Sequence, residues 1–290
     1  MKIGYVQFKP QFGDIDYNAA KIYALLEKKQ ADLMVLPELA TTGYYFRDRK
    51  EAYALSEDPK KSFVVEVLVE LCKKNGMHVI TGFNERNGRK NYNSALLIGK
   101  KGIVDVYRKI HLFNTEKNCF TPGDKPLRVH KIGTARVGMM ICFDWFFPEA
   151  MRTLALRGAQ LILHPSNLVL PHCPEGLRIR CLENRVFAAS ADRVGTEEGG
   201  EGPLTFIGRS EIVSPLGVSP RLGTLRSDFL GTLSPDPAKG ARCPLGKPPR
   251  QDCILNLRIR TVRAKLELVG GVNGESLRRA INTGRNQHSP

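Results

Sequence analysis

The first 215 residues alternate between two patterns of apolar and polar positions. Short apolar runs have the length and composition of strands, and longer segments with apolar residues three and four positions apart have the period of an amphipathic helix. Strands are predicted over residues 2–8, 32–38, 77–83, 94–99, 103–107, 135–141 and 160–164. Helices are predicted over residues 17–29, 61–75, about 148–157 and about 176–187. This alternation is typical of a single α/β domain built on layered sheets, since no linker interrupts it.

Two local signals support the predicted connections. Lys100-Lys-Gly102 separates two apolar runs and predicts a β-hairpin. Pro148 has the backbone angle that suits the start of a helix, and Glu149 suits the positive end of the helix dipole. We therefore expect a helix to begin at Pro148.

The pattern fades after about residue 214. Seven prolines lie between Ser214 and Pro249, among many glycine, arginine and serine residues, and this composition favours loops. Only residues 253–259 have the composition of a strand. The abrupt change fits either a divergent insert or a coding-frame disturbance.

The net charge of +15 raises the question of nucleic-acid binding. Residues 211–290 hold 13 Lys or Arg against 6 Asp or Glu, so much of the excess lies in the last part of the chain. No zinc-finger, recognition-helix or RNA-binding signature accompanies this charge, and diffuse positive charge alone supports only salt-sensitive, non-specific binding. The sequence therefore disfavours nucleic acid as a partner.

The composition predicts a cytoplasmic protein. No apolar run approaches the roughly 18 residues that a membrane span needs, and the N-terminal residues enter a strand-like pattern without a leader region. The chain has seven cysteines, an odd number, and no C-x-x-C spacing. This favours reduced thiols over a disulfide framework or a zinc ribbon.

Three reactive side chains, Glu38, Lys109 and Cys142, lie at or just after the ends of predicted strands. In α/β sheets, sites are usually built from strand ends and the loops that leave them. A cysteine that attacks a carbonyl carbon needs a base to take its proton and positive charge near the developing oxyanion. In this hypothesis Glu38 is the base and Lys109 the charge, and the backbone N–H of Phe143 is a second donor to the oxyanion.

Taken singly, these residues have ordinary structural explanations. A free cysteine is among the most buried residue types, and a charge at a strand end is commonly a surface charge. A second arrangement would pair Cys142 with His111 or His164 and an aspartate such as Asp144, as in thiol proteases. No local signature supports it. A binding protein without catalysis is a further alternative.

Three segments, in their order and spacing, resemble the nitrilase, or carbon–nitrogen hydrolase, superfamily. Leu36-Pro-Glu38 with Gly43-Tyr44 is similar to the family's glutamate motif, and Tyr107-Arg-Lys109 is similar to its lysine motif. Cys142-Phe-Asp-Trp-Phe-Phe-Pro-Glu149 is similar to its cysteine motif. The resemblance covers about residues 1–215 and continues through Phe120-Thr-Pro-Gly-Asp124, Gly158-Ala159, His164-Pro165, Glu183-Asn-Arg185, Phe206-Ile-Gly-Arg-Ser210 and the strand motif Ser210-Glu-Ile-Val-Ser-Pro-Leu-Gly217.

This resemblance implies a four-layer α-β-β-α sandwich with a Glu-Lys-Cys site and neither cofactor nor metal. Glu38 would deprotonate Cys142, which would attack an amide carbonyl or a nitrile carbon to give a thioester that water hydrolyses. Lys109 would stabilise the tetrahedral intermediate, and the family's second glutamate corresponds to Glu116. Family members commonly pair through helices near these motifs, so a homodimer or larger oligomer is implied.

The substrate is expected to be a small amide or carbamoyl compound, with an aliphatic nitrile as the alternative. Dedicated nitrilases of the family typically have Cys-Trp-Glu, and Cys142-Phe-Asp departs from that pattern. Tyr44 and Asn167 lie in loops expected to shape the substrate site. Trp145 and Phe146 are expected either to line the acyl pocket or to pack in the core behind the cysteine.

The resemblance also divides the chain. Residues 1–218 form the expected hydrolase domain, and residues 219–290 form a divergent Pro/Gly/Arg-rich segment with one or two completing strands at about 252–260. Within that segment, residues 219–250 are predicted to be a poorly ordered surface excursion and residues 283–290 to be unstructured.

Overall fold

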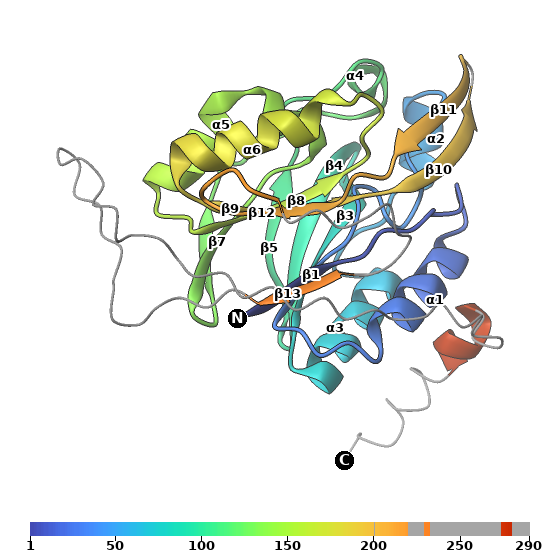
Figure 1. The fold of residues 1–290 in the computed structure, drawn as a ribbon. Coiled ribbons are helices and arrows are strands. Elements are labelled where there is room, and N and C mark those ends of the chain that lie inside the picture. Colours follow the sequence, from blue (N-terminus) through green and yellow to red (C-terminus); the bar gives the residue numbers. More distant parts are fainter. Residues whose placement is uncertain (200, 220–228, 233–273, 280–290) are drawn as a thin grey trace.

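The computed structural model describes residues 1–199, 201–219, 229–232 and 274–279, and these contain two large β-sheets (Figure 1). The first sheet has the strand order β13-β1-β2-β3-β4-β5. Its strands are β1 (Lys2–Tyr5), β2 (Leu33–Val35), β3 (His78–Asn87), β4 (Lys90–Gly99), β5 (Gly102–Arg108) and β13 (Phe229–Thr232). The second sheet has the order β12-β9-β8-β7-β6. Its strands are β6 (Val129–Ile132), β7 (Ala135–Met139), β8 (Leu161–Ser166), β9 (Phe187–Asp192) and β12 (Glu211–Val213).

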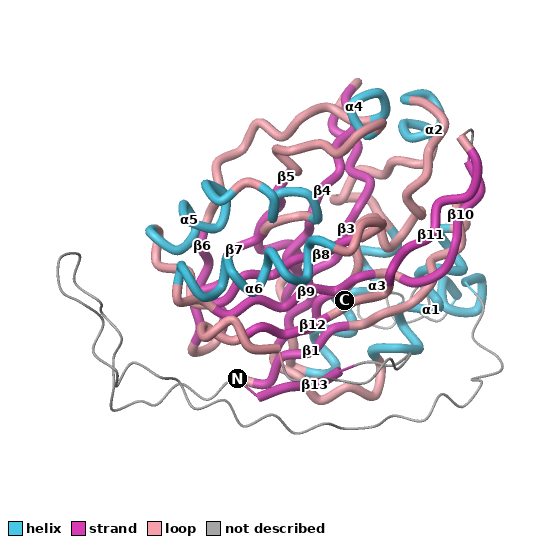
Figure 2. The backbone as a smooth tube through the Cα atoms, turned by 45° about the horizontal axis from the view of Figure 1, so that its top comes forward, coloured by secondary structure: helices cyan, strands magenta, loops and turns pink. Residues whose placement is uncertain are grey.

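The two sheets face each other across a shared core, and each is covered on its outer side by a pair of helices (Figures 1 and 2). α1 (Ile15–Leu26) and α3 (Phe63–Asn75) cover the first sheet, and α5 (Pro148–Leu156) and α6 (His172–Asn184) cover the second. Ile3 and Leu33 of the first sheet share one apolar cluster with Val137 and Leu161 of the second. This arrangement confirms the predicted four-layer α-β-β-α sandwich.

Local signals in the sequence define where the two helices that cover the first sheet begin and end. The side chain of Asp14 accepts a hydrogen bond from the N–H of Tyr17 at 2.9 Å and so caps α1. The side chain of Ser62 caps α3 in the same way, and Gly76 ends that helix in the left-handed conformation, with φ of 64°. The apolar faces of both helices then pack on the first sheet.

The short helices α2 (Arg49–Ala54) and α4 (Glu116–Cys119), the 3₁₀ helix η1 (Cys142–Phe146) and one hairpin lie outside these layers. A further short helix spans residues 274–279. The hairpin consists of β10 (Val194–Gly199) and β11 (Gly202–Ile207), which pair in antiparallel register. η1 follows β7 and α4 follows β5, so both begin close to strand ends.

The structure corrects several predicted boundaries. α6 begins at His172, earlier than the predicted start near residue 176, and residues 187–192 are a strand although the predicted helix reached residue 187. β13 pairs with β1, whereas the sequence pattern placed the first strand of the divergent segment at about residue 252. The predicted strand at 252–260 and the unstructured end at 283–290 lie outside the described residues, as do most of residues 219–250.

Candidate active site

Strand ends of both sheets place the three predicted catalytic side chains. Glu38 follows β2, Lys109 directly follows β5, and Cys142 begins η1 after β7. Because the sheets pack face to face, these ends meet in the interior. Glu38 is 0% exposed, Lys109 1% and Cys142 7%. The structure therefore brings the three residues together in a buried site.

Lys109 lies between two carboxylates. Its Nζ donates to Oε1 of Glu38 at 2.7 Å and to Oε1 of Glu116 at 2.7 Å. Burial alone would lower the pKa of Lys109, but the carboxylates of Glu116 and Glu38 outweigh that effect, so the pKa lies above its ordinary value. Lys109 therefore carries a positive charge in the middle of the site.

Glu38 has one occupied and one free carboxylate oxygen. Oε1 accepts hydrogen bonds from Lys109 and from Nδ2 of Asn93, each at 2.7 Å. Oε2 is buried and has no hydrogen-bond partner among the described residues. Burial, with a contribution from Glu116, raises the pKa of Glu38 to about 7 although Lys109 opposes the shift. The free oxygen is suited to accept a proton near neutral pH. Asn93 was not among the predicted site residues.

Cys142 is held in a strained backbone conformation. Its φ is 38°, in the left-handed region that residues other than glycine rarely adopt. Nε2 of His164 donates to the carbonyl oxygen of Cys142 at 2.9 Å, and its Nδ1 contacts Oγ of Ser190 at 3.0 Å. These contacts fix the position of the Cys142 carbonyl group.

The surroundings of Cys142 favour the thiol over the thiolate. Burial and the nearby charges of Glu38 and Glu116 raise its pKa well above the ordinary value, and the charge of Lys109 acts in the opposite direction. Sγ donates to the carbonyl oxygen of Asn167 at 3.7 Å. The cysteine thus needs a base before it can act as a nucleophile.

The two histidines of the alternative arrangement have other partners. Nδ1 of His111 contacts Oδ1 of Asp144 at 2.8 Å, and its ring stacks on Phe147 with the centroids 3.7 Å apart. Asp144 also accepts from the hydroxyl of Tyr107 at 2.8 Å and from the N–H of Ile141 at 2.9 Å. His164 binds the backbone of the cysteine. Among the described residues, neither ring makes a hydrogen bond with Sγ of Cys142.

Tyr44 and Asn167 both contact the catalytic candidates. Burial, followed by the charges of Glu116 and Glu38, raises the pKa of Tyr44 well above its ordinary value, so the phenol lies close to both carboxylates. Glu116 accepts a further bond from the N–H of Phe113 at 3.0 Å. Nδ2 of Asn167 donates to the carbonyl oxygen of Glu38 at 2.9 Å. Both residues therefore lie against the catalytic candidates.

The three residues after Cys142 have different positions. The N–H of Phe143 lies in the first turn of η1, where N–H groups have no partner within the helix. Trp145 packs on α6: a Cβ placed on Gly176 would come within 2.1 Å of its ring. Phe146 is 55% exposed and stacks on Phe143, with ring centroids 5.4 Å apart. Trp145 thus packs from η1 against α6, and Phe146 lies at the surface and not in the core.

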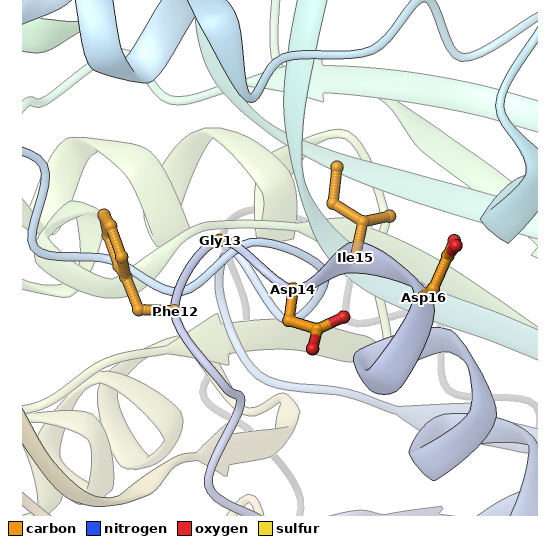
Figure 3. Close-up of a pocket in the computed structure, with 5 residues that line it drawn as sticks. All are labelled: Phe12, Gly13, Asp14, Ile15 and Asp16. Atoms are coloured by element: carbon orange, nitrogen blue, oxygen red, sulfur yellow. The ribbon is translucent and has the colours of Figure 1, made fainter. Parts of the chain in front are cut away.

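The structure also has a surface pocket that none of the catalytic candidates lines. An open surface pocket at the start of α1 is lined by Phe12, Gly13, Asp14, Ile15 and Asp16 (Figure 3). Among the described residues, no three or more His, Cys, Asp or Glu side chains are grouped so that they could hold a metal ion. Within the same residues, every helix is too short or too polar to cross a membrane.

Comparison with known proteins relates this site to a family. Residues 2–219 match the sequence profile described as carbon–nitrogen hydrolase. A protein named nitrilase from Pyrococcus abyssi is 45% identical over 218 residues, which cover 74% of this chain and 82% of the relative. An (R)-stereoselective amidase from a Pseudomonas species is 32% identical and is covered to 78% of its length. The crystal structure of an amidase from a Nesterenkonia species superposes with a TM-score of 0.68 at 26% identity, over 79% of this chain and 89% of that chain.

Proposed function

The chain belongs to the carbon–nitrogen hydrolase family and is an enzyme of that class, and from this premise we propose that it hydrolyses small amides or carbamoyl compounds through a thioester on Cys142. One observation carries the proposal: Lys109 binds one oxygen of Glu38, and Oε2 is buried with no hydrogen-bond partner in the part of the chain that the structure describes, in a site that also holds the thiol. A base with an unoccupied oxygen and a fixed cation are what an acylating cysteine requires.

The acylation step follows from these positions. Oε2 of Glu38 takes the proton of Sγ, and the thiolate forms a bond to the carbonyl carbon while the C=O electron pair moves to oxygen. Nζ of Lys109 and the N–H of Phe143 stabilise that oxyanion. When the intermediate collapses, the C–N bond breaks and the proton held by Glu38 passes to the departing nitrogen, so ammonia or an amine leaves.

Deacylation uses the same groups in the opposite direction. Water gives a proton to Glu38 and its oxygen attacks the thioester carbon. The C–S bond then breaks, the sulfur recovers the proton, and a carboxylic acid is released. Lys109 pairs with Glu38 and with Glu116. These two ion pairs keep the carboxylate of Glu38 in the same orientation during acylation and deacylation.

The thioester can be trapped. We expect mass spectrometry of the protein, quenched in acid during turnover of a mixed panel of small amides and carbamoyl compounds, to find an acyl group on the peptide that contains Cys142. The mass of that group would also identify the acyl part of the substrate. Cys142→Ala should release no ammonia and carry no adduct, and Cys181→Ala, another buried thiol, should behave as the wild type. Unchanged turnover in Cys142→Ala would refute the proposal.

A nitrile is the second candidate substrate, because the 45% identical relative is named a nitrilase. The same groups suit that chemistry: the thiolate would add to the nitrile carbon, and Glu38 would pass its proton to the nitrogen. The product of this addition is a thioimidate, and a water molecule must add to its carbon before the C–N bond breaks and ammonia leaves. Amide and nitrile substrates with the same acyl group would then give the same thioester. The ratio of their kcat/KM values therefore decides between the two functions, and a ratio in favour of the nitrile would reassign the chain as a nitrilase.

We propose further that the enzyme is a homodimer that pairs through α5 and α6. Large apolar side chains are exposed on these two helices and on η1, which contacts both: Leu156 at 66% on α5, Ile179 at 58% and Leu182 at 43% on α6, and Phe146 at 55% on η1. Contiguous exposed apolar residues of this kind mark interaction surfaces. We expect Ile179→Glu to shift the species seen by light scattering from dimer to monomer, while Val104→Glu, at an exposed position of β5, leaves the dimer intact. A wild type that is monomeric at micromolar concentration would contradict this.

A further inference from the structure

A buried ion pair near the β10–β11 hairpin has no part in the mechanism above. Arg193, directly before β10, is 0% exposed, and its Nη1 pairs with Oε1 of Glu197. Its Nη2 donates to the carbonyl oxygen of Pro10 at 3.4 Å, and its guanidinium lies 4.1 Å from the centroid of Phe206. A buried ion pair has a large desolvation cost and often adds little net stability. Stability alone therefore does not explain this pair.

The second oxygen of Glu197 binds a loop that leads to the active site. Oε2 accepts hydrogen bonds from the N–H groups of Tyr44 at 3.0 Å and of Tyr45 at 2.8 Å. Gly43 allows this close approach: its φ is 83°, and a Cβ at that position would come within 2.8 Å of Oε1 of Glu197. The ring of Phe206, beneath the guanidinium, also meets the Tyr44 ring edge-on, with centroids 5.8 Å apart. The hairpin thus fixes both backbone and side chain of Tyr44.

Tyr44 links this pair to the catalytic lysine. Its phenol lies close to the carboxylate of Glu116, and Oε1 of Glu116 binds Nζ of Lys109 at 2.7 Å. We propose that Glu197, neutralised by Arg193, is a positioning residue: it holds the backbone of Tyr44 so that the phenol keeps Glu116 against Lys109. This inference rests on the proposed function, because it gives the pair a part in the same site.

Neutralising Glu197 tests the proposal. In Glu197→Gln the side chain keeps its size but no longer balances Arg193 and binds the two N–H groups more weakly, so the loop shifts. A displacement of about 1 Å costs about 100-fold in rate, and we expect kcat on the best amide substrate to fall by about that factor while KM changes less than threefold. Glu198→Gln, at the exposed neighbouring position of β10, should match the wild type.

A double-mutant cycle separates positioning from a general loss of structure. If Glu197 acts through the phenol of Tyr44, then Glu197→Gln should lower kcat far less in a Tyr44→Phe background than in the wild type, because residues that act in one chain are not additive. Additive losses, or a Glu197→Gln enzyme as active as Glu198→Gln, would overturn the inference. Should Glu197→Gln lack the thermal transition of the wild type, Arg193→Lys, which keeps the buried charge but not the guanidinium geometry, replaces it in the same cycle.

The outcomes also distinguish this inference from the proposed function. The cycle compares kcat values for the reaction that depends on Cys142, which is the turnover that Cys142→Ala abolishes. Turnover that survives in Cys142→Ala would refute the thioester mechanism, whereas turnover that depends on Cys142 but is insensitive to Glu197 would refute only the positioning role.

Discussion

Replacement of Lys109 by methionine is expected to lower kcat/KM for every amide substrate by at least about 1000-fold. Methionine fills much of the same volume, so the loss comes from the ammonium group. Without it the oxyanion keeps only the N–H of Phe143, and loss of one such donor alone costs about 100- to 1000-fold. Glu38 and Glu116 would then repel each other without the cation between them, which raises the pKa of Glu38 further and leaves it protonated at neutral pH.

Steady-state kinetics at two pH values checks this prediction. Raising the pH should deprotonate Glu38 and recover the part of the activity lost through its protonation. The part lost because the Lys109 ammonium group no longer stabilises the oxyanion should not return. Lys117→Ala, at an exposed position of α4, is the matched control and should have wild-type kinetics. A buried ion pair that loses one partner costs about 3–5 kcal/mol of stability, so the variant is assayed below its own thermal transition. Full activity in folded Lys109→Met would exclude the proposed role of the lysine.

The strands that carry the site could be predicted because they are apolar runs of ordinary strand composition. β7 ends at Met139, three residues before Cys142, and the pattern placed that end within two residues. β9 could not be found this way, because Ala188, Ala189 and Ala191 favour helix over strand. Pairing with β8 decides their conformation, and tertiary context of this kind overrides local propensity.

The candidate site was predictable only as far as its residues adjoin a recognisable motif. Asn93 belongs to β4, and its side chain donates to Glu38. Its backbone is held beside the catalytic lysine, because its carbonyl oxygen accepts from the N–H of Lys109 at 2.8 Å. Glu197 lies in a glutamate- and glycine-rich stretch that has the composition of an exposed loop. It is nevertheless buried, because it accepts from the N–H of Tyr44 and its partner Arg193 donates to the carbonyl oxygen of Pro10, which is distant in the sequence. Contacts of this range depend on the packing of the sheets and leave no periodic signal in the sequence.

Glu38→Gln is expected to lower kcat/KM by about 1000-fold or more, and to change its pH dependence as well. In the wild type, burial raises the pKa of Glu38 to about 7. Below that pH the carboxyl group holds a proton and cannot take the one on Cys142; above it the carboxylate is free. We therefore expect kcat/KM to rise about tenfold per pH unit below pH 7 and to level off above it. This rise of kcat/KM below pH 7 is the acid limb of the pH profile. Glutamine does not titrate, so the acid limb should be absent from the residual activity of Glu38→Gln.

The same measurement decides between the carboxylate and a histidine as the base. His164→Asn would lower activity in either mechanism, because the ring holds the carbonyl oxygen of Cys142 at 2.9 Å, so that variant alone does not discriminate. Glu211→Gln provides the control, because Glu211 is another buried carboxylate whose pKa burial raises, and it lies on β12, outside the site. It should retain both rate and acid limb. A Glu38→Gln enzyme that kept its rate and its acid limb would place the base on another residue, and His111 and His164 would then be the first to test.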